Sequence, residues 1–128
     1  MHKCCLSIRQ PWAWAILNAG KNVENRTWRT SYRGELFIHA SKARPRRDSL
    51  DELRGILERI GRPFPQPEDF QFGALVGKCN LFDCVPSEKV DSPWRDESGY
   101  CLMLSEIQLI KPVPVRGALG IFLLPDQL

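Results

Sequence analysis

Three charged residues that lie close together in the sequence, Lys21, Glu24 and Arg26, are the side chains best placed to do chemistry. In an extended segment, Glu24 and Arg26 share one face because side chains alternate along a strand. A carboxylate flanked by two cations stays ionised. It can then accept hydrogen bonds from the amino or ring N–H groups of a nucleobase. The alternative is a surface ion-pair cluster that only orders this turn.

Lys21 follows the predicted end of a helix, where the helix dipole favours a cation. It can act there as a structural charge, or it can contact a phosphate or a base carbonyl. A lysine that serves as a general base must be able to lose its proton at the working pH. Glu24, three residues away, favours the charged ammonium instead. The spacing therefore favours a binding or structural ion pair over an activated amine.

Positive charge is concentrated in the first third of the chain. Residues 1–47 hold ten Lys or Arg against two acidic residues, whereas residues 48–128 hold eight against thirteen. A one-sided basic surface with interleaved aromatic residues is typical of proteins that bind polyanions, although a charge run is usually a solvated face. Guanidinium groups suit phosphate oxygens. We expect the phosphate contacts to come from Arg29, Arg33, Lys42, Arg44, Arg46 and Arg47.

Two tryptophans are candidates for stacking on nucleobases. Trp28 follows the charged segment, and Trp94 lies in the loop Ser92-Pro93-Trp94-Arg95. Stacking of a base on an aromatic ring supplies about 1–3 kcal/mol. Trp12 falls on the apolar face of a predicted helix, so we expect it in the core, whereas Trp14 falls off that face. Trp28 and Trp94 are thus predicted to form opposite walls of a cleft.

Polar residues near two predicted strand ends complete the candidate site. Gln10 precedes a helix, and its amide can either read a base edge or cap the first helical turn. Arg9 shares a strand face with Ser7. His39 and Ser41 end a later strand, and we expect them to contact a base or a phosphate. Nucleophilic catalysis by this His/Ser pair is disfavoured, because residues two apart on a strand seldom reach each other.

The pattern of apolar residues predicts five or six strands and two main helices. The strands are expected at residues 4–8, 22–28, 35–40, 73–85 and 100–110, with two short ones in 113–124 around Gly117 and Gly120, and the helices at 11–19 and 49–60. Strands without a regular β-α-β alternation indicate an α+β fold. In so short a chain they favour one domain, residues 1–128, built as a small closed or half-closed barrel with the helices at its openings.

Local signals mark the ends of the second helix and the loop after it. Ser49 and Glu52 have the spacing of a capping box, which predicts that the helix begins there. Gly61 supplies a left-handed stop. Pro63, Pro65 and Pro67 follow, which predicts a loop rather than a helix or a central strand.

Composition bears on cofactors and location. The five cysteines are an odd number without framework spacing, so we interpret them as buried small hydrophobes rather than disulfide partners. His2 and His39 do not have zinc-site spacing, and we expect no metal and no other cofactor. No apolar run is long enough to cross a membrane, and no signal peptide is recognisable. We therefore expect an intracellular, cytoplasmic protein without a membrane partner.

Several motifs in order along the chain resemble the ASCH domain, the activating signal cointegrator homology family, and most closely its cointegrator-type subgroup. The family signature G-x-K-x-x-E-x-R is matched at Lys21, Glu24 and Arg26, with Ala19 at the Gly position and Gly20 one place later. The other matching segments are residues 5–13, 33–40, 74–84, 92–94 and 112–117. The resemblance implies a PUA-like β-barrel, with a cleft between barrel and helices that accommodates nucleic acid.

These observations favour a nucleic-acid-binding module for RNA or DNA, with single strands preferred, rather than an enzyme. The resemblance also offers an alternative, because some small members of the wider family are amidohydrolases that act on modified nucleosides such as N4-acetylcytidine. Lys21 and Glu24 would be the catalytic residues in that case. The position that those enzymes fill with Thr is Glu24 here, which disfavours this alternative. A third alternative is that the basic face binds an acidic protein partner.

Overall fold

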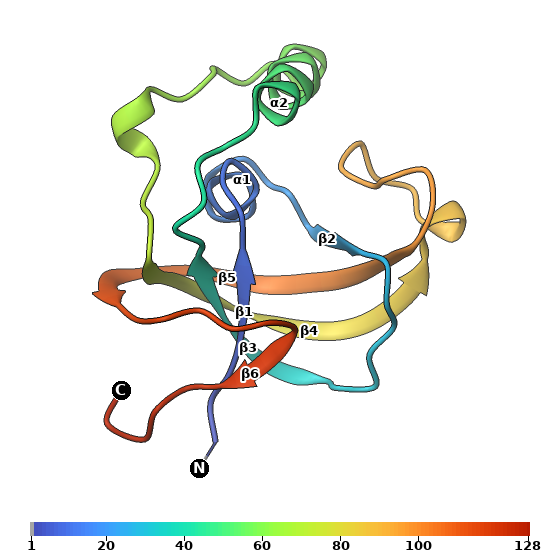
Figure 1. Ribbon diagram of the computed structural model, residues 1–128. Coiled ribbons are helices and arrows are strands. Elements are labelled where there is room, and N and C mark those ends of the chain that lie inside the picture. Colours follow the sequence, from blue (N-terminus) through green and yellow to red (C-terminus); the bar gives the residue numbers. More distant parts are fainter. Residues whose placement is uncertain (1) are drawn as a thin grey trace.

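The structure, a computed structural model, describes residues 2–128 as six strands, two α-helices and two short 3₁₀ turns (Figure 1). The elements in chain order are β1 (Cys4–Ile8), α1 (Trp12–Asn18), β2 (Val23–Arg26), β3 (Gly34–Ala40), α2 (Arg47–Ile60), η1 (Pro67–Asp69), β4 (Ala74–Pro86), η2 (Ser87–Lys89), β5 (Tyr100–Pro114) and β6 (Ile121–Leu123).

All six strands belong to one curled sheet, in the order β2-β5-β4-β3-β1-β6. Only β1 and β3 pair in parallel, and the other pairs are antiparallel. The β4–β5 register shifts at three places between Leu75 and Asp83, as expected for bulges that bend a long strand pair. β2 and β6 are the two edges and do not pair with each other, so the barrel stays open on one side. The predicted α+β fold, a small barrel with two helices, is confirmed.

Both helices lie on the same side of the sheet, with α1 against the strands and α2 above α1 (Figure 1). The inner core lies between α1 and the sheet and includes Ile8, Ile16, Ile38, Leu81 and Leu102. α2 contributes Leu53, Ile56 and Leu57 to a second cluster, in which they join Ala15, Ala19, Val23 and Trp94. Ala19 and Val23, which flank the turn that carries Lys21, both belong to this second cluster.

The predicted start of α2 was wrong. The helix begins at Arg47 with Arg46 as its N-cap, and no side chain caps it. Ser49 instead donates its backbone N–H to Asp48 Oδ1, so the Ser49/Glu52 capping box does not form. The predicted stop is confirmed, since Gly61 adopts a left-handed conformation with φ +74°.

The predicted pair of strands in residues 113–124 is corrected to one, β6, because β5 continues through Pro112 to Pro114. Proline is tolerated there because β2 pairs with β5 only over residues 100–103, which leaves that edge of β5 unpaired further on.

The prediction that the cysteines are buried small hydrophobes holds for three of the five, since Cys4 and Cys84 are only half-buried. All five are free, and Cys5, Cys79 and Cys101 are buried. Burial raises the pKa of the Cys5 and Cys79 thiols to about 12, so both are neutral hydrophobic groups. Within residues 2–128, no helix has the length and apolar character to cross a membrane. In the same range, no three His, Cys, Asp or Glu side chains are grouped so that they could ligate a metal ion.

Candidate functional site

Lys21, Glu24 and Arg26 form one connected ion-pair network that is largely buried. Lys21 Nζ donates to Glu24 Oε1 at 3.1 Å and to the Val23 carbonyl oxygen at 2.5 Å. Arg26 donates from Nε to Glu24 Oε2 at 3.0 Å, and its Nη2 lies 2.9 Å from the same oxygen as an ion pair. Lys21 is only 2% exposed. A buried ammonium that donates to a carboxylate and a carbonyl is arranged as a structural cation, and the network as a whole carries one net positive charge.

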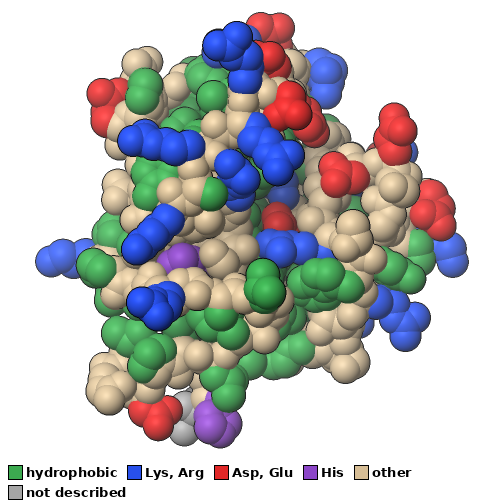
Figure 2. All heavy atoms as spheres, viewed as in Figure 1, with side chains coloured by type: hydrophobic (Ala, Val, Ile, Leu, Met, Phe, Trp, Pro, Cys, Tyr) green, Lys and Arg blue, Asp and Glu red, His purple; other side chains and the backbone are tan. Residues whose placement is uncertain are grey.

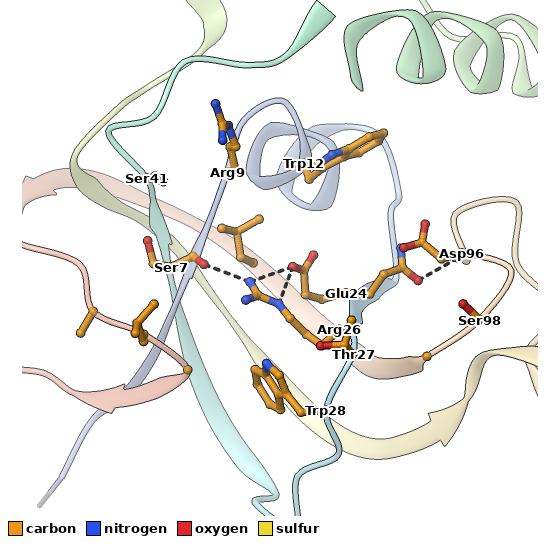
Figure 3. Close-up of a pocket in the computed structure, with 16 residues that line it drawn as sticks. Ser7, Arg9, Trp12, Glu24, Arg26, Thr27, Trp28, Ser41, Asp96 and Ser98 are labelled. Atoms are coloured by element: carbon orange, nitrogen blue, oxygen red, sulfur yellow. Dashed lines mark hydrogen bonds and ion pairs between the residues drawn. The ribbon is translucent and has the colours of Figure 1, made fainter. Parts of the chain in front are cut away.

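Arg26 also connects the two sides of the open barrel. Its Nη2 donates to the carbonyl oxygen of Ser7 at 3.0 Å (Figure 3). Pairing of β1 with β6 ends at Leu6, so the Ser7 carbonyl lies where the ladder has stopped. Glu24 orients Arg26 for this contact. The ion-pair network therefore joins β2 to β1 where backbone pairing is missing.

A cleft of about 600 Å³ lies in this gap, with Glu24 and Arg26 on its floor. Trp12 and Trp28 lie on opposite sides of the Glu24–Arg26 pair, and Asp96 faces Ser7 and Arg9 across the cleft (Figure 3). The residues that line the cleft come from β1, the start of α1, β2, and the loops around residues 41, 96–99 and 118–120. They are Ser7, Ile8, Arg9, Trp12, Glu24, Asn25, Arg26, Thr27, Trp28, Ser41, Asp96, Ser98, Gly99, Ala118, Leu119 and Gly120.

An inner recess of about 170 Å³ borders the cleft and shares part of its lining, including Trp12 and Asp96. Lys21, Glu52 and Trp94 complete the recess. Burial raises the pKa of the Asp96 carboxyl, an effect that Lys21 opposes and the charge of Glu24 reinforces. Burial likewise raises the pKa of Glu52, and Asp96 adds to that effect. The cleft is thus acidic on the side of Asp96, opposite Arg9.

Asp96→Asn should increase the affinity of the chain for a phosphate-bearing oligonucleotide by about two- to threefold at low salt, because it removes a negative charge from the cleft wall. The pKa of Asp96 is raised, so acidification neutralises the wild-type carboxylate earlier than an ordinary Asp. The difference between the two proteins should therefore shrink as the pH falls from neutral toward that pKa. Fluorescence-anisotropy titrations at several pH values measure both effects, with exposed Asp126→Asn as the control. Weaker binding by the Asp96→Asn variant than by the wild-type protein would contradict this.

Basic side chains gather to one side of the cleft. Figure 2 shows a hollow in this face, with Lys and Arg mainly to its left and Asp and Glu mainly to its right. Arg9 lines the cleft and donates from Nε to the Arg44 carbonyl oxygen at 2.9 Å. Ser41 also lines it and begins the loop that carries Lys42, Arg44, Arg46 and the first residue of α2, Arg47. All of these cations are exposed.

Two further predicted cations lie apart from that loop. Arg29 lines a neighbouring hollow that borders the cleft at Trp28. Arg33 instead faces Asp83, with 3.6 Å between Nη2 and Oδ1, and donates to the carbonyl oxygens of Thr30 and Tyr32. We therefore omit Arg33 from the basic group. The name basic rim is used below for Arg9, Arg29, Lys42, Arg44, Arg46 and Arg47.

Gln10 is not placed to read a base edge. It is buried, and its Oε1 accepts the Trp14 backbone N–H at 2.9 Å. Its Nε2 donates to the Gln71 carbonyl oxygen at 2.9 Å, which anchors the proline-containing loop. The amide therefore caps the first turn of α1, the alternative that the sequence left open.

His39 and Trp94 were also expected to contact ligand, and burial removes both from the cleft surface. His39 Nε2 lies 2.7 Å from the Val115 carbonyl oxygen, which can only accept, so Nε2 donates. Its Nδ1 lies 2.8 Å from the Ser7 hydroxyl. Loop residues after β5 cover this part of β3, which the alternation along the strand did not reveal. Trp94 packs in the core beneath α2 and borders only the inner recess.

Trp12 and Asp96 line the cleft although sequence reasoning did not select them. Trp12 was expected in the core, but it is only partly buried, and the Lys21 ammonium lies 5.8 Å from its ring centroid. Its place on the apolar face of the predicted helix gave no sign of this exposure. Asp96 had no signal in the sequence, because contacts from distant segments hold its loop at the cleft, among them Asn25, whose Oδ1 accepts the Asp96 N–H at 2.9 Å.

Comparisons with known proteins agree with the sequence motifs. The profile of the family described as "ASCH domain" matches residues 6–111. The chain is 30% identical over 120 residues to "Activating signal cointegrator 1" from Mus musculus. It is 34% identical over 120 residues to the protein of the same name from Homo sapiens. Each alignment covers 88% of this chain but 21% of the relative, so the chain spans about a fifth of the length of these curated relatives.

Proposed function

Because this chain belongs to the ASCH domain family, we propose that it is a nucleic-acid-binding module that takes RNA or another single strand into the open side of its barrel. The observation that carries this proposal is the cleft, which joins a basic rim to a polar floor and two partly exposed tryptophan rings. The basic rim contacts the phosphates, and the cleft receives a base.

Charge separation supports the assignment of the phosphate path. Residues 1–47 contain ten Lys or Arg residues and only two acidic residues. Arg9 and Ser41, which begins the loop from Lys42 to Arg47, line the cleft, and Asp96 lies across from Arg9 (Figure 3). A polyphosphate chain is attracted to the first side and repelled by the second. We therefore place the backbone along Arg9 and the loop from Lys42 to Arg47.

The cleft floor supports contact with a heterocycle. A volume of about 600 Å³ lies within the range of pockets that hold small ligands. Partly exposed Arg26 can donate to base carbonyl or ring nitrogen acceptors, and Asp96 can accept from amino groups. Trp12 and Trp28 offer ring faces on either side, and stacking on such rings tolerates any base.

Single strands fit this site better than a duplex. Bases in a duplex are paired and stacked, whereas those of a loop or single strand can turn outward into a cleft. Within residues 2–128 there is also no long basic helix suited to the major groove, because α2 packs through Leu53, Ile56 and Leu57 and carries four acidic residues against three arginines. RNA or single-stranded DNA is therefore the expected ligand class.

Binding measurements with a panel of mixed-sequence RNA, single-stranded DNA and duplex DNA test this proposal. Single strands should bind with Kd values of about 10 µM or lower at low salt. Four phosphate contacts would make the logarithm of affinity fall with that of salt concentration with a slope of about −3. Heparin serves as the generic polyanion, and equally tight binding to it would favour an acidic protein partner. No salt-sensitive binding to any nucleic acid would contradict the proposal.

A further inference from the structure

The loop between β5 and β6 places an unusually exposed apolar side chain at the cleft edge. Leu119 lines the cleft and is 97% exposed, more than any other large hydrophobic residue in the described part of the chain. A single exposed Leu is ordinary on a protein surface. Leu119 differs because it borders a polar cleft that already contains the partly exposed ring of Trp28, and because the loop around it is fixed.

Contacts on both sides of Leu119 hold this loop in place. His39 Nε2 donates to the Val115 carbonyl oxygen at 2.7 Å. Gly117 packs so closely on the Ser7–His39 pair that a Cβ there would lie 2.8 Å from His39 Cε1 and 3.0 Å from Ser7 Oγ. Gly120 then turns the chain into β6 with φ +62°. Leu119 is therefore presented to solvent by an anchored loop.

A second hollow lies beside the cleft and shares two residues with it. It is a shallow, open hollow of about 420 Å³, lined by Trp28, Arg29, Thr30, Gly120 and Ile121. Trp28 and Gly120 also line the main cleft, so the two hollows meet there. Glycine has no side chain to block the passage. A ligand can thus run from the cleft floor over Gly120 into the second hollow.

Resting on the proposed function, we propose that this second hollow binds the next nucleotide of the same single strand. Its base stacks on the exposed part of the Trp28 ring, and Leu119 packs as an apolar wedge between this base and the one in the cleft. Arg29, which is exposed beside Trp28, contacts the connecting phosphate. Apolar wedges that separate neighbouring bases are a known device of nucleic-acid-binding proteins.

The chemistry of the two hollows supports this division. Arg26 lies with its guanidinium carbon 5.7 Å from the Trp28 ring centroid, which makes the cleft side of this tryptophan polar. The outer hollow combines the aromatic ring with the aliphatic side chain of Ile121 and one cation. The aromatic and aliphatic side chains suit one base, and the single guanidinium suits one phosphate. A duplex cannot follow this path, because its bases remain paired.

Affinity as a function of ligand length tests the second subsite. Adenosine monophosphate and adenylates of two, three and four residues are titrated into the wild-type protein and Leu119→Ser. The wild-type affinity should rise steeply from one to two residues, and the ratio of dinucleotide to mononucleotide affinity should be about three- to tenfold smaller in the Leu119→Ser variant. Leu119 is almost fully exposed, so its replacement should leave the fold intact.

The matched control is Leu109→Ser, which changes another exposed leucine, 65% exposed, that lines a hollow on a different part of the surface. Identical length dependence in the wild-type, Leu119→Ser and Leu109→Ser proteins would overturn the second subsite and leave the proposed function standing. Failure of every adenylate and of the mixed-sequence panel to bind would overturn both.

Discussion

Glu24→Gln is expected to destabilise the protein by about 3 kcal/mol, because it leaves two buried or half-buried cations without their shared carboxylate. Glu24 accepts from Lys21 at one oxygen and from Arg26 at the other. A glutamine amide can accept at only one of these positions, and its NH₂ group faces a donor at the other. Loss of the Glu24 contact also frees Arg26 from its orientation toward the Ser7 carbonyl. Urea unfolding of both proteins gives the difference in the free energy of unfolding.

The control is Glu97→Gln, which makes the same chemical change at an exposed position in the loop after Asp96 and should cost less than about 0.5 kcal/mol. Lys21→Met should cost less than Glu24→Gln, because Glu24 keeps Arg26 as a partner. A loss below about 1 kcal/mol in the Glu24→Gln variant would show that the network does not hold the open side of the barrel together.

The triple variant Arg44→Gln, Arg46→Gln and Arg47→Gln is expected to weaken binding to single strands by about 10- to 100-fold at low salt, because each lost cation reduces the number of counterions released from the nucleic acid. The slope of log affinity against log salt should become smaller in magnitude by about 2 if all three contact phosphates. These side chains are exposed and form no ion pair within residues 2–128. Titrations at four salt concentrations measure both quantities.

A charge-matched control separates local contact from the loss of net charge. Lys78→Gln, Lys89→Gln and Lys111→Gln remove the same number of charges from positions that line neither the cleft nor the hollow beside it. This control should bind nearly as well as the wild-type protein at moderate salt, where charges far apart are screened. Equal losses in the two triple variants would show that only overall charge matters, which would contradict the assignment of the basic rim.

Local sequence signals predicted most of the fold. β1 has the predicted bounds, and β3 is one residue longer than predicted. Both strands were predictable because their apolar alternation and β-branched residues agree with the burial that the sheet imposes. The end of α2 at Gly61 was predictable because a left-handed C-cap depends on the backbone conformation of that residue alone. The start of α2 was missed because the helix begins two residues before Ser49 without a side-chain cap, so no capping motif in the sequence marks it.

The candidate site was only partly predictable, for a physical reason. The spacing of Glu24 and Arg26 predicted their shared face, since that depends on β2 alone. Whether Gln10, His39 and Trp94 reach solvent depends on segments far away in the sequence, namely Gln71, Val115 and α2. Strand alternation gives the direction of a side chain but not what covers it. The sequence pattern therefore predicted that Glu24 and Arg26 lie together, but it wrongly placed Gln10, His39 and Trp94 at the cleft surface.

The fold and the proposed function share one feature, the open side of the barrel. A closed barrel would satisfy every strand edge. In this chain β2 and β6 remain unpaired with each other, and the side chain of Arg26 connects β2 to β1 instead. The gap that results is where the cleft forms. The same ion-pair network therefore contributes to stability and forms the floor of the proposed binding site.

Chemical-shift mapping with a mixed-sequence single strand tests the central claim most directly, because the four tryptophan indole N–H signals report on different parts of the molecule. Trp12 and Trp28 line the cleft, whereas Trp14 lines a separate hollow with Leu17 and Leu109. We expect the Trp12 and Trp28 signals to shift during the titration, together with the backbone signals of residues 24–29 and 117–121, while the Trp14 signal stays in place. A shift of Trp14 with Trp12 and Trp28 unchanged would contradict the account.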